Sequence, residues 1–215
     1  TNAGGTTVLN GGSVTTTGAI TLNDAVTLGA ATTLSGQNVT LASTVNGAYG
    51  LTVNDGGVTT FGGVVGGTAA LASLTTDAAG STRINGGAIT TTGAVRFNDA
   101  VVLGADTTIA TTNSNVTFAA VVDSANATAR ALTVAAGSGD VSLVSAVGST
   151  NTLGAMTINS TGETRFDGAV TSASLLTNAG GTAVFNGGSV TTTGAITLND
   201  AVTLGTTTTL SGQNV

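Results

Sequence analysis

The chain has 215 residues, enough for one large or two ordinary domains, but its composition is far from that of an average globular protein. It holds 33 Gly and no Pro, Cys, His, Trp or Lys, and its formal charge of −6 comes from nine Asp and one Glu against four Arg. No basic stripe is available to bind nucleic acid, and no apolar run is long enough to span a bilayer, so we expect neither a nucleic acid partner nor a membrane span. Disorder is disfavoured because 40% of the residues are apolar and regularly spaced.

The sequence repeats itself over a long period. Residues 1–39 return almost unchanged at 177–215, at an offset of 176 residues. The four differences are Thr7/Ala183, Leu9/Phe185, Ala30/Thr206 and Ala31/Thr207. A looser copy begins at Thr76. We therefore predict that residues 1–215 form a single continuous fragment of a longer repeat array.

A shorter motif lies within the long repeat, in which two inward-facing residues flank one outward-facing residue. This is the period-two alternation of a strand, and Gly, Asn, Asp and Ser bound each run. In chain order the predicted inward pairs are Thr7/Leu9, Ile20/Leu22, Val39/Leu41, Thr59/Phe61, Thr82/Ile84, Val95/Phe97, Val116/Phe118, Val141/Leu143, Thr164/Phe166, Ala183/Phe185 and Ile196/Leu198.

Two further sets of apolar residues accompany this motif and predict a second and a third strand. The second set lies six or seven positions after the first member of each inward pair: Val14, Val26, Val45, Val65, Ile89, Val101, Val122, Val147, Val170, Val190 and Val202. The third set precedes several first strands: Leu34, Leu51, Leu74, Ile109, Leu132, Met156, Leu175 and Leu210. No helical periodicity of 3.6 residues is present.

The spacing of the first strands predicts coils of about 20 residues with three short strands each. Most first strands lie 19 to 25 residues apart, but three steps of only 13 residues occur, from 7 to 20, 82 to 95 and 183 to 196. At these steps either the coil is short or the strands change sides.

Short strands with one or two inward side chains can bury an apolar face only by stacking on neighbouring coils. The predicted fold is therefore all-β, a right-handed parallel β-helix (β-solenoid), with handedness taken from the general rule for parallel crossovers. The absence of proline agrees with this fold, because proline would remove a hydrogen bond from a strand that is paired on both sides.

The motifs VTF, TRF and VRF, followed by AAVV, DGAV and NDAV, resemble the filamentous-haemagglutinin-type β-helix repeats of large bacterial secreted surface proteins. The units LTVNDGGVTTFGGVVGGT and ITTTGAVRFNDAVVLGADTTI extend this resemblance over essentially the whole chain. It implies export through the outer membrane, an extracellular or cell-surface location, and a part in adhesion, aggregation or biofilm formation. The family's secretion domain carries Asn-Pro motifs, so this proline-free chain resembles the shaft instead.

Catalysis by a His dyad, a Cys nucleophile or a Schiff-base Lys is excluded, because the chain has no His, Cys or Lys. Asp140 and Glu163 remain as a pair of carboxylates, because each directly precedes a first strand in successive motifs. The alternative is that both are solvated edge residues, with one of them near Arg165 on the outer face.

Three other patterns are candidate binding sites. The first consists of the Asn-Asp pairs Asn23/Asp24, Asn98/Asp99 and Asn199/Asp200, which could bind cations or form turns. The second consists of Arg83, Arg96 and Arg165 at outward strand positions, as a ligand face or as protection against aggregation. The third consists of the threonine triplets 15–17, 90–92 and 191–193, as an ice-binding array. The pairs and triplets recur 75 and 101 residues apart instead of once per coil, which argues against both arrays.

We predict no catalytic, cofactor-binding or metal-binding residues and no enzymatic activity. The expected function is that of a structural shaft of a bacterial cell-surface adhesin, which holds a binding tip away from the cell. The alternative is an extracellular fibre or biofilm matrix protein that associates with like chains, and an ice- or cation-binding solenoid is a weaker third possibility. Neighbouring repeats of the same chain are the expected partners.

Overall fold

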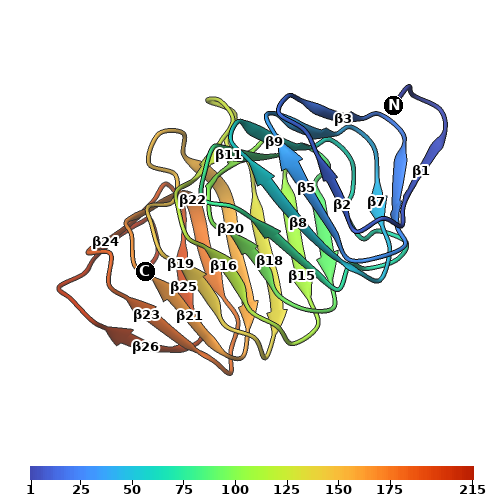
Figure 1. Cartoon of the computed structure of the whole chain (residues 1–215). Coiled ribbons are helices and arrows are strands. Elements are labelled where there is room, and N and C mark those ends of the chain that lie inside the picture. Colours follow the sequence, from blue (N-terminus) through green and yellow to red (C-terminus); the bar gives the residue numbers. More distant parts are fainter.

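A computed structural model describes all residues 1–215 and contains 27 short strands and no helix. Strands pair in parallel with the strands of the coils before and after them, and those of the end coils pair on one side, so the chain forms a β-solenoid whose axis runs from the N-terminus to the C-terminus (Figure 1). Ten coils at about 4.8 Å per coil give a rod about 50 Å long. The prediction of an all-β solenoid with three short strands per coil is confirmed.

The strands form three faces, numbered here in the order in which the chain first visits them. Face 1 contains β1 (Thr6–Leu9), β4 (Ala25–Leu28), β7 (Val45–Asn46), β12 (Ala88–Thr91), β15 (Thr107–Thr111), β18 (Leu132–Gly137), β20 (Leu153–Ser160) and β25 (Ile196–Leu198). Face 2 contains β2 (Ser13–Thr15), β5 (Thr32–Gly36), β8 (Gly50–Asp55), β10 (Ser73–Thr76), β13 (Val95–Phe97), β16 (Val116–Phe118), β19 (Val141–Leu143), β21 (Glu163–Phe166), β23 (Thr182–Phe185) and β26 (Ala201–Leu204).

Face 3 contains β3 (Ile20–Leu22), β6 (Val39–Leu41), β9 (Val58–Phe61), β11 (Ser81–Ile84), β14 (Ala100–Leu103), β17 (Val122–Ser124), β24 (Ser189–Thr192) and β27 (Thr209–Ser211). The eight-residue strand β22 (Val170–Thr177) belongs to two faces: its first residues pair with β24 on face 3 and its last residues pair with β25 on face 1.

The inward side chains of each face stack into ladders along the axis and form one continuous apolar core. On face 2, for example, Leu74, Val95, Val116 and Val141 are register partners in successive coils, and all four are fully buried. The predicted inward pairs are confirmed, because they are buried except in the end coils, where Thr7, Leu9 and Leu198 are partly exposed.

The three 13-residue steps mark places where the first-strand motif moves to another face of the same coil. Thr82 pairs with Thr59 and Val101 on face 3, whereas Val95 pairs with Leu74 and Val116 on face 2. Between Thr82 and Val95 the chain passes through β12 on face 1, so the coil keeps its normal length and the motif changes sides. The same change occurs between 7 and 20 and between 183 and 196.

As a result, the three copies of the repeated block lie on three different faces. The first inward pair of the block begins with Thr7 on face 1, that of the looser copy with Thr82 on face 3, and that of the last copy with Ala183 on face 2. From Thr7 to Ala183 the chain makes eight full coils and advances by one further face. The long repeat is therefore not a whole number of coils.

One difference between the first and last copies follows from this shift. Leu9 stacks on Leu28 of face 1, whereas its counterpart Phe185 lies on face 2 above Phe166. The rings of Phe166 and Phe185 stack with centroids 4.9 Å apart and an angle of 6° between their planes. The last copy thus has phenylalanine in place of leucine at the position where the neighbouring coil also has an aromatic ring.

Candidate functional site

Asp140 and Glu163, the carboxylate pair considered for catalysis, are neighbours on the outside of face 2. Val141 and Thr164, the residues that follow them, are register partners, and the backbone N–H of Glu163 donates to Asp140 Oδ1 at 2.9 Å. Both side chains are exposed, and the structure has no pocket around them or elsewhere. The pair is brought together as expected, but one carboxylate oxygen already accepts a backbone hydrogen bond on an open surface.

The outward arginines do not form one face. Arg96 and Arg165 share an outward ladder on face 2 but are three coils apart, about 14 Å along the axis, with Thr117 and Ser142 between them. Arg83 lies on face 3.

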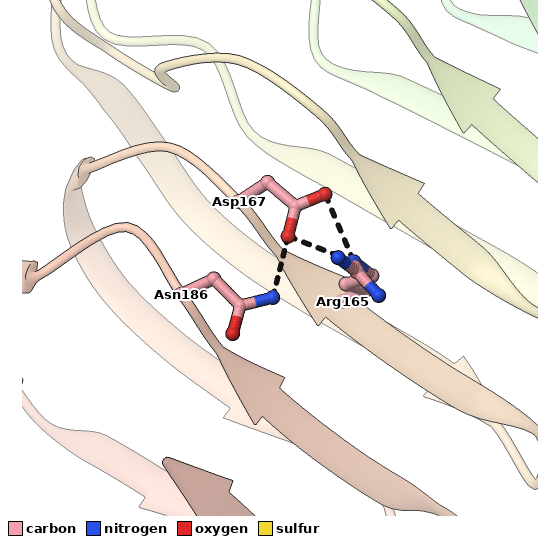
Figure 2. A network of polar contacts seen from close by, with 3 residues as sticks. All are labelled: Arg165, Asp167 and Asn186. Carbon is pink, nitrogen blue, oxygen red and sulfur yellow. Dashed lines mark hydrogen bonds and ion pairs between the residues drawn. The ribbon is translucent and has the colours of Figure 1, made fainter. Parts of the chain in front are cut away.

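Each of these three arginines is bound to the side chain two residues further along the chain. Arg83 and Arg96 donate through Nε to Asn85 and Asn98, at 3.3 and 2.6 Å. Arg165 forms an ion pair with Asp167, at 2.8 Å, and Asn186 of the next coil also donates to Asp167 (Figure 2). Glu163 and Arg165 both point outward from β21, two residues apart, but the carboxylate that forms the ion pair with Arg165 is Asp167.

The three Asn-Asp pairs lie at three different corners of the solenoid. Asp24 lies between faces 3 and 1, Asp99 between faces 2 and 3, and Asp200 between faces 1 and 2. All three carboxyl groups are buried and face the chain's own backbone or hydroxyl groups: Gly5 N–H donates to Asp24, and Gly181 N–H donates to Asp200. No group of three or more acidic side chains in the structure has an arrangement that could hold a metal ion.

Sequence reasoning missed the most regular acidic feature. Asp55, Asp77 and Asp99 lie 22 residues apart, at the corner between faces 2 and 3 of three successive coils. Asp55 is 1% exposed and accepts hydrogen bonds from the backbone N–H groups of Asn38 and Val39, both at 2.7 Å. The backbone N–H of Asp55 in turn donates to Asp77. The 22-residue spacing, one carboxylate per coil, is the signal that would have revealed this column.

Buried carboxylates at these corners satisfy N–H groups that have no partner in the sheets. Asp55 Oδ1 also accepts from Gly57, and Oδ2 accepts from the Thr59 hydroxyl. An unpaired buried backbone group is costly, so the corner aspartates stabilise the fold. This use of their oxygens favours a structural role over cation binding.

The threonine triplets do not form a flat array. They follow strands on faces 2, 1 and 3 in turn, so they lie at three different corners. In two copies the middle threonine points inward: Thr91 and Thr192 are 1% and 8% exposed and donate to the carbonyl groups of Gly93 and Gly194. This geometry argues against an ice-binding surface.

No known protein family, curated protein or solved structure matches the chain. The structure has no helix that is both long and apolar enough to cross a membrane.

Proposed function

We propose that this chain is a non-catalytic structural shaft of a bacterial cell-surface adhesin, located outside the cell, that holds a binding tip at a distance. The observation that carries the proposal is the stacking of ten coils into a rod. Its buried aspartates accept hydrogen bonds from backbone N–H groups at the corners of the coils. The resemblance to filamentous-haemagglutinin-type repeats supports the same assignment.

The repeated block moves from one face to another, and this favours the function of a spacer rather than that of a binding surface. A ligand that needs a regular flat surface requires the same side chains on one face in successive coils. Here the 176-residue step moves the repeated block from face 1 to face 2. An array of such repeats displays each group around the whole rod and preserves only length and stiffness.

Length per repeat is the property that tests the proposal. Inserting one additional 176-residue repeat adds eight coils and one face, so the rod should lengthen by about 40 Å. Electron microscopy of the protein with and without the insertion measures this change, and labelled antibodies on cells report the distance of the tip from the surface. Isolated rods that lengthen and carry the tip further out are expected.

Two outcomes would overturn the proposal that the chain is a shaft. Rods that join side by side or end to end into continuous bundles would favour the alternative of a self-associating matrix fibre. An insertion that leaves the distance between tip and cell unchanged would show that the rod does not act as a spacer.

A further inference from the structure

The same corner occurs in all three copies of the repeated block, and its polar residues differ at one position. Each corner contains an aspartate together with two residues from the preceding coil, which lie 23 and 17 positions before it. The three sets are Thr1/Thr7/Asp24, Thr76/Thr82/Asp99 and Thr177/Ala183/Asp200.

The middle copy has a complete set of hydrogen bonds. Thr76 Oγ1 donates to Asp99 Oδ1 at 2.6 Å, and Thr82 Oγ1 donates to Asp99 Oδ2 at 2.8 Å. In the first copy the Thr7 hydroxyl likewise donates to Asp24 Oδ2, at 3.1 Å. The threonine at this second position therefore places a hydroxyl group directly against the carboxylate in both copies.

In the last copy Ala183 replaces that threonine, and the carboxylate loses the hydroxyl donor. Asp200 is 7% exposed, its Oδ1 accepts from Gly181 N–H at 2.9 Å, and its Oδ2 has no hydrogen-bond partner. The hydroxyl of Thr177, the counterpart of Thr76, is fully buried and also has no partner.

A third atom without a hydrogen-bond partner, the hydroxyl oxygen of Thr164, lies in the coil before Ala183. Thr164 is the register partner of Ala183 in the preceding coil, it is fully buried, and its Oγ1 has no partner. Only four buried side-chain nitrogen or oxygen atoms in the chain lack a hydrogen bond, and three of them flank this one alanine. Native proteins rarely leave such atoms unpaired, so their grouping at one point indicates a common partner.

We propose that one water molecule is bound beside Ala183 and bridges Asp200 Oδ2 and the hydroxyl of Thr177, with the hydroxyl of Thr164 as its third partner. Alanine is smaller than threonine by a hydroxyl and a methyl group, which together are about the size of one water molecule. Three polar partners match the number that buried waters have on average. The water takes the place of the hydroxyl groups of Thr7 and Thr82 and donates to the carboxylate as they do.

The chemistry of the site favours water over a cation. A calcium ion requires six to eight oxygen ligands, and this corner offers one carboxylate oxygen and two hydroxyls. Hydroxyl groups can donate to water, and water can donate to the carboxylate, so every group in the site is satisfied.

Direct observation of the site is the first test. A crystal structure of the chain at high resolution should show one ordered solvent atom within hydrogen-bond distance of Thr177 Oγ1 and Asp200 Oδ2. In the Ala183→Thr variant the new hydroxyl should occupy that position. In the matched Thr82→Ala variant a new solvent atom should lie between Thr76 and Asp99. Absence of the solvent atom from the unaltered chain would overturn the proposal.

Stability gives a second, independent test. Ala183→Thr should raise the melting temperature by about 2 °C, because the carboxylate regains a permanent donor. Ala183→Val has the shape of threonine without its hydroxyl, so it should expel the water, lower the melting temperature and speed amide hydrogen exchange at Gly181. A valine variant as stable as the threonine variant would contradict the proposal. A rise in melting temperature of the unaltered chain with sodium or calcium chloride, but not with choline chloride, would show that the site binds a cation instead.

Discussion

Asp24 and Asp99 occupy equivalent positions in two copies of the block, yet the fold shifts their acidities in opposite directions. The hydrogen bond from Gly5 N–H lowers the pKa of Asp24 below its usual value of 3.8. Burial raises the pKa of Asp99 above 3.8, although the hydroxyls of Thr76 and Thr82 partly offset the effect. The contrast arises because Asp24 lies in the end coil, whereas Asp99 is enclosed between coils and near Asp77.

These shifts predict opposite dependences of stability on pH. The folded chain favours the ionised form of Asp24, so this group stabilises the fold above pH 3.8 and loses that contribution as the pH falls through its lowered pKa. Ionisation of Asp99 costs stability, and that cost is relieved as the pH falls through its raised pKa toward 3.8.

The matched variants Asp24→Asn and Asp99→Asn separate the two contributions. Urea unfolding from about pH 2 to pH 8 should show that Asp24→Asn loses less stability in acid than the unaltered chain. Asp99→Asn should instead lack part of the stability that the unaltered chain gains as the pH falls toward 3.8. Equal pH profiles for the two variants would contradict the opposite shifts.

The aromatic stacks on face 2 give a second prediction at the scale of single residues. Phe166 stacks on Phe185, whereas Phe61 is buried on face 3 without an aromatic neighbour. Replacing either residue with leucine changes the buried volume equally. Phe166→Leu should therefore cost about 0.5 to 1.5 kcal/mol more in free energy of unfolding than Phe61→Leu, which is the contribution of the stacked pair beyond burial. Equal losses would show that the stack adds nothing to burial.

At the scale of the strand, alternation decides which substitutions the chain tolerates. In β16, Val116 is fully buried in the ladder of face 2, and Thr117 is half-buried on the outside. Val116→Asp should cost several kcal/mol because an unpaired carboxylate enters the core, whereas Thr117→Asp should cost less than about 1 kcal/mol. Chemical denaturation measures both. Similar losses would show that the assignment of inward and outward residues is wrong.

Alternation also explains how much of the fold could be predicted from the sequence. The inward positions followed directly from the pattern, because burial on one side of a strand has a period of two residues. The face of each strand did not follow, because all three faces are parallel sheets around the same core. Ile20/Leu22 on face 3 and Val95/Phe97 on face 2 therefore have the same pattern. Only the register of the neighbouring coils distinguishes them.

The candidate sites show the same limit. Adjacent coils were expected to place Asp140 beside Glu163, and they do. The ion pair of Arg165 could not be predicted in the same way, because Glu163 and Asp167 both lie two residues from it along the chain. The unsatisfied Asp200 could not be found without the structure, because the effect of Ala183 depends on which groups surround it.

For the whole molecule, equivalence of the three faces means that sequence blocks can move around the rod without loss of the fold. The first and last copies are nearly identical, yet they occupy neighbouring faces. Each face thus accepts the same alternation of inward and outward residues. Such tolerance allows repeats to be duplicated or lost in steps that are not whole coils.

Removal of one coil tests this modular behaviour. Arg96 and Thr117 are register partners, so deletion of residues 96–116 joins Val95 to Thr117 and places Phe118 where Phe97 was. The ladders of all three faces then close over the gap, with Val122 above Thr82 and Val134 above Ile89. Because each coil contacts only its neighbours, the shortened chain should fold cooperatively, and small-angle scattering should show a rod about 5 Å shorter.

The control is a deletion one residue shorter. Removing only residues 97–116 retains Arg96 before Thr117, so Phe118 takes an outward position in the joined strand. A shift of one residue exchanges the buried and exposed sides of a strand, and this variant should be far less stable or fail to fold. Equal thermal stability of the two deletions would mean that neighbouring coils do not depend on register. In that case the ladders would not be the source of the rod's stability.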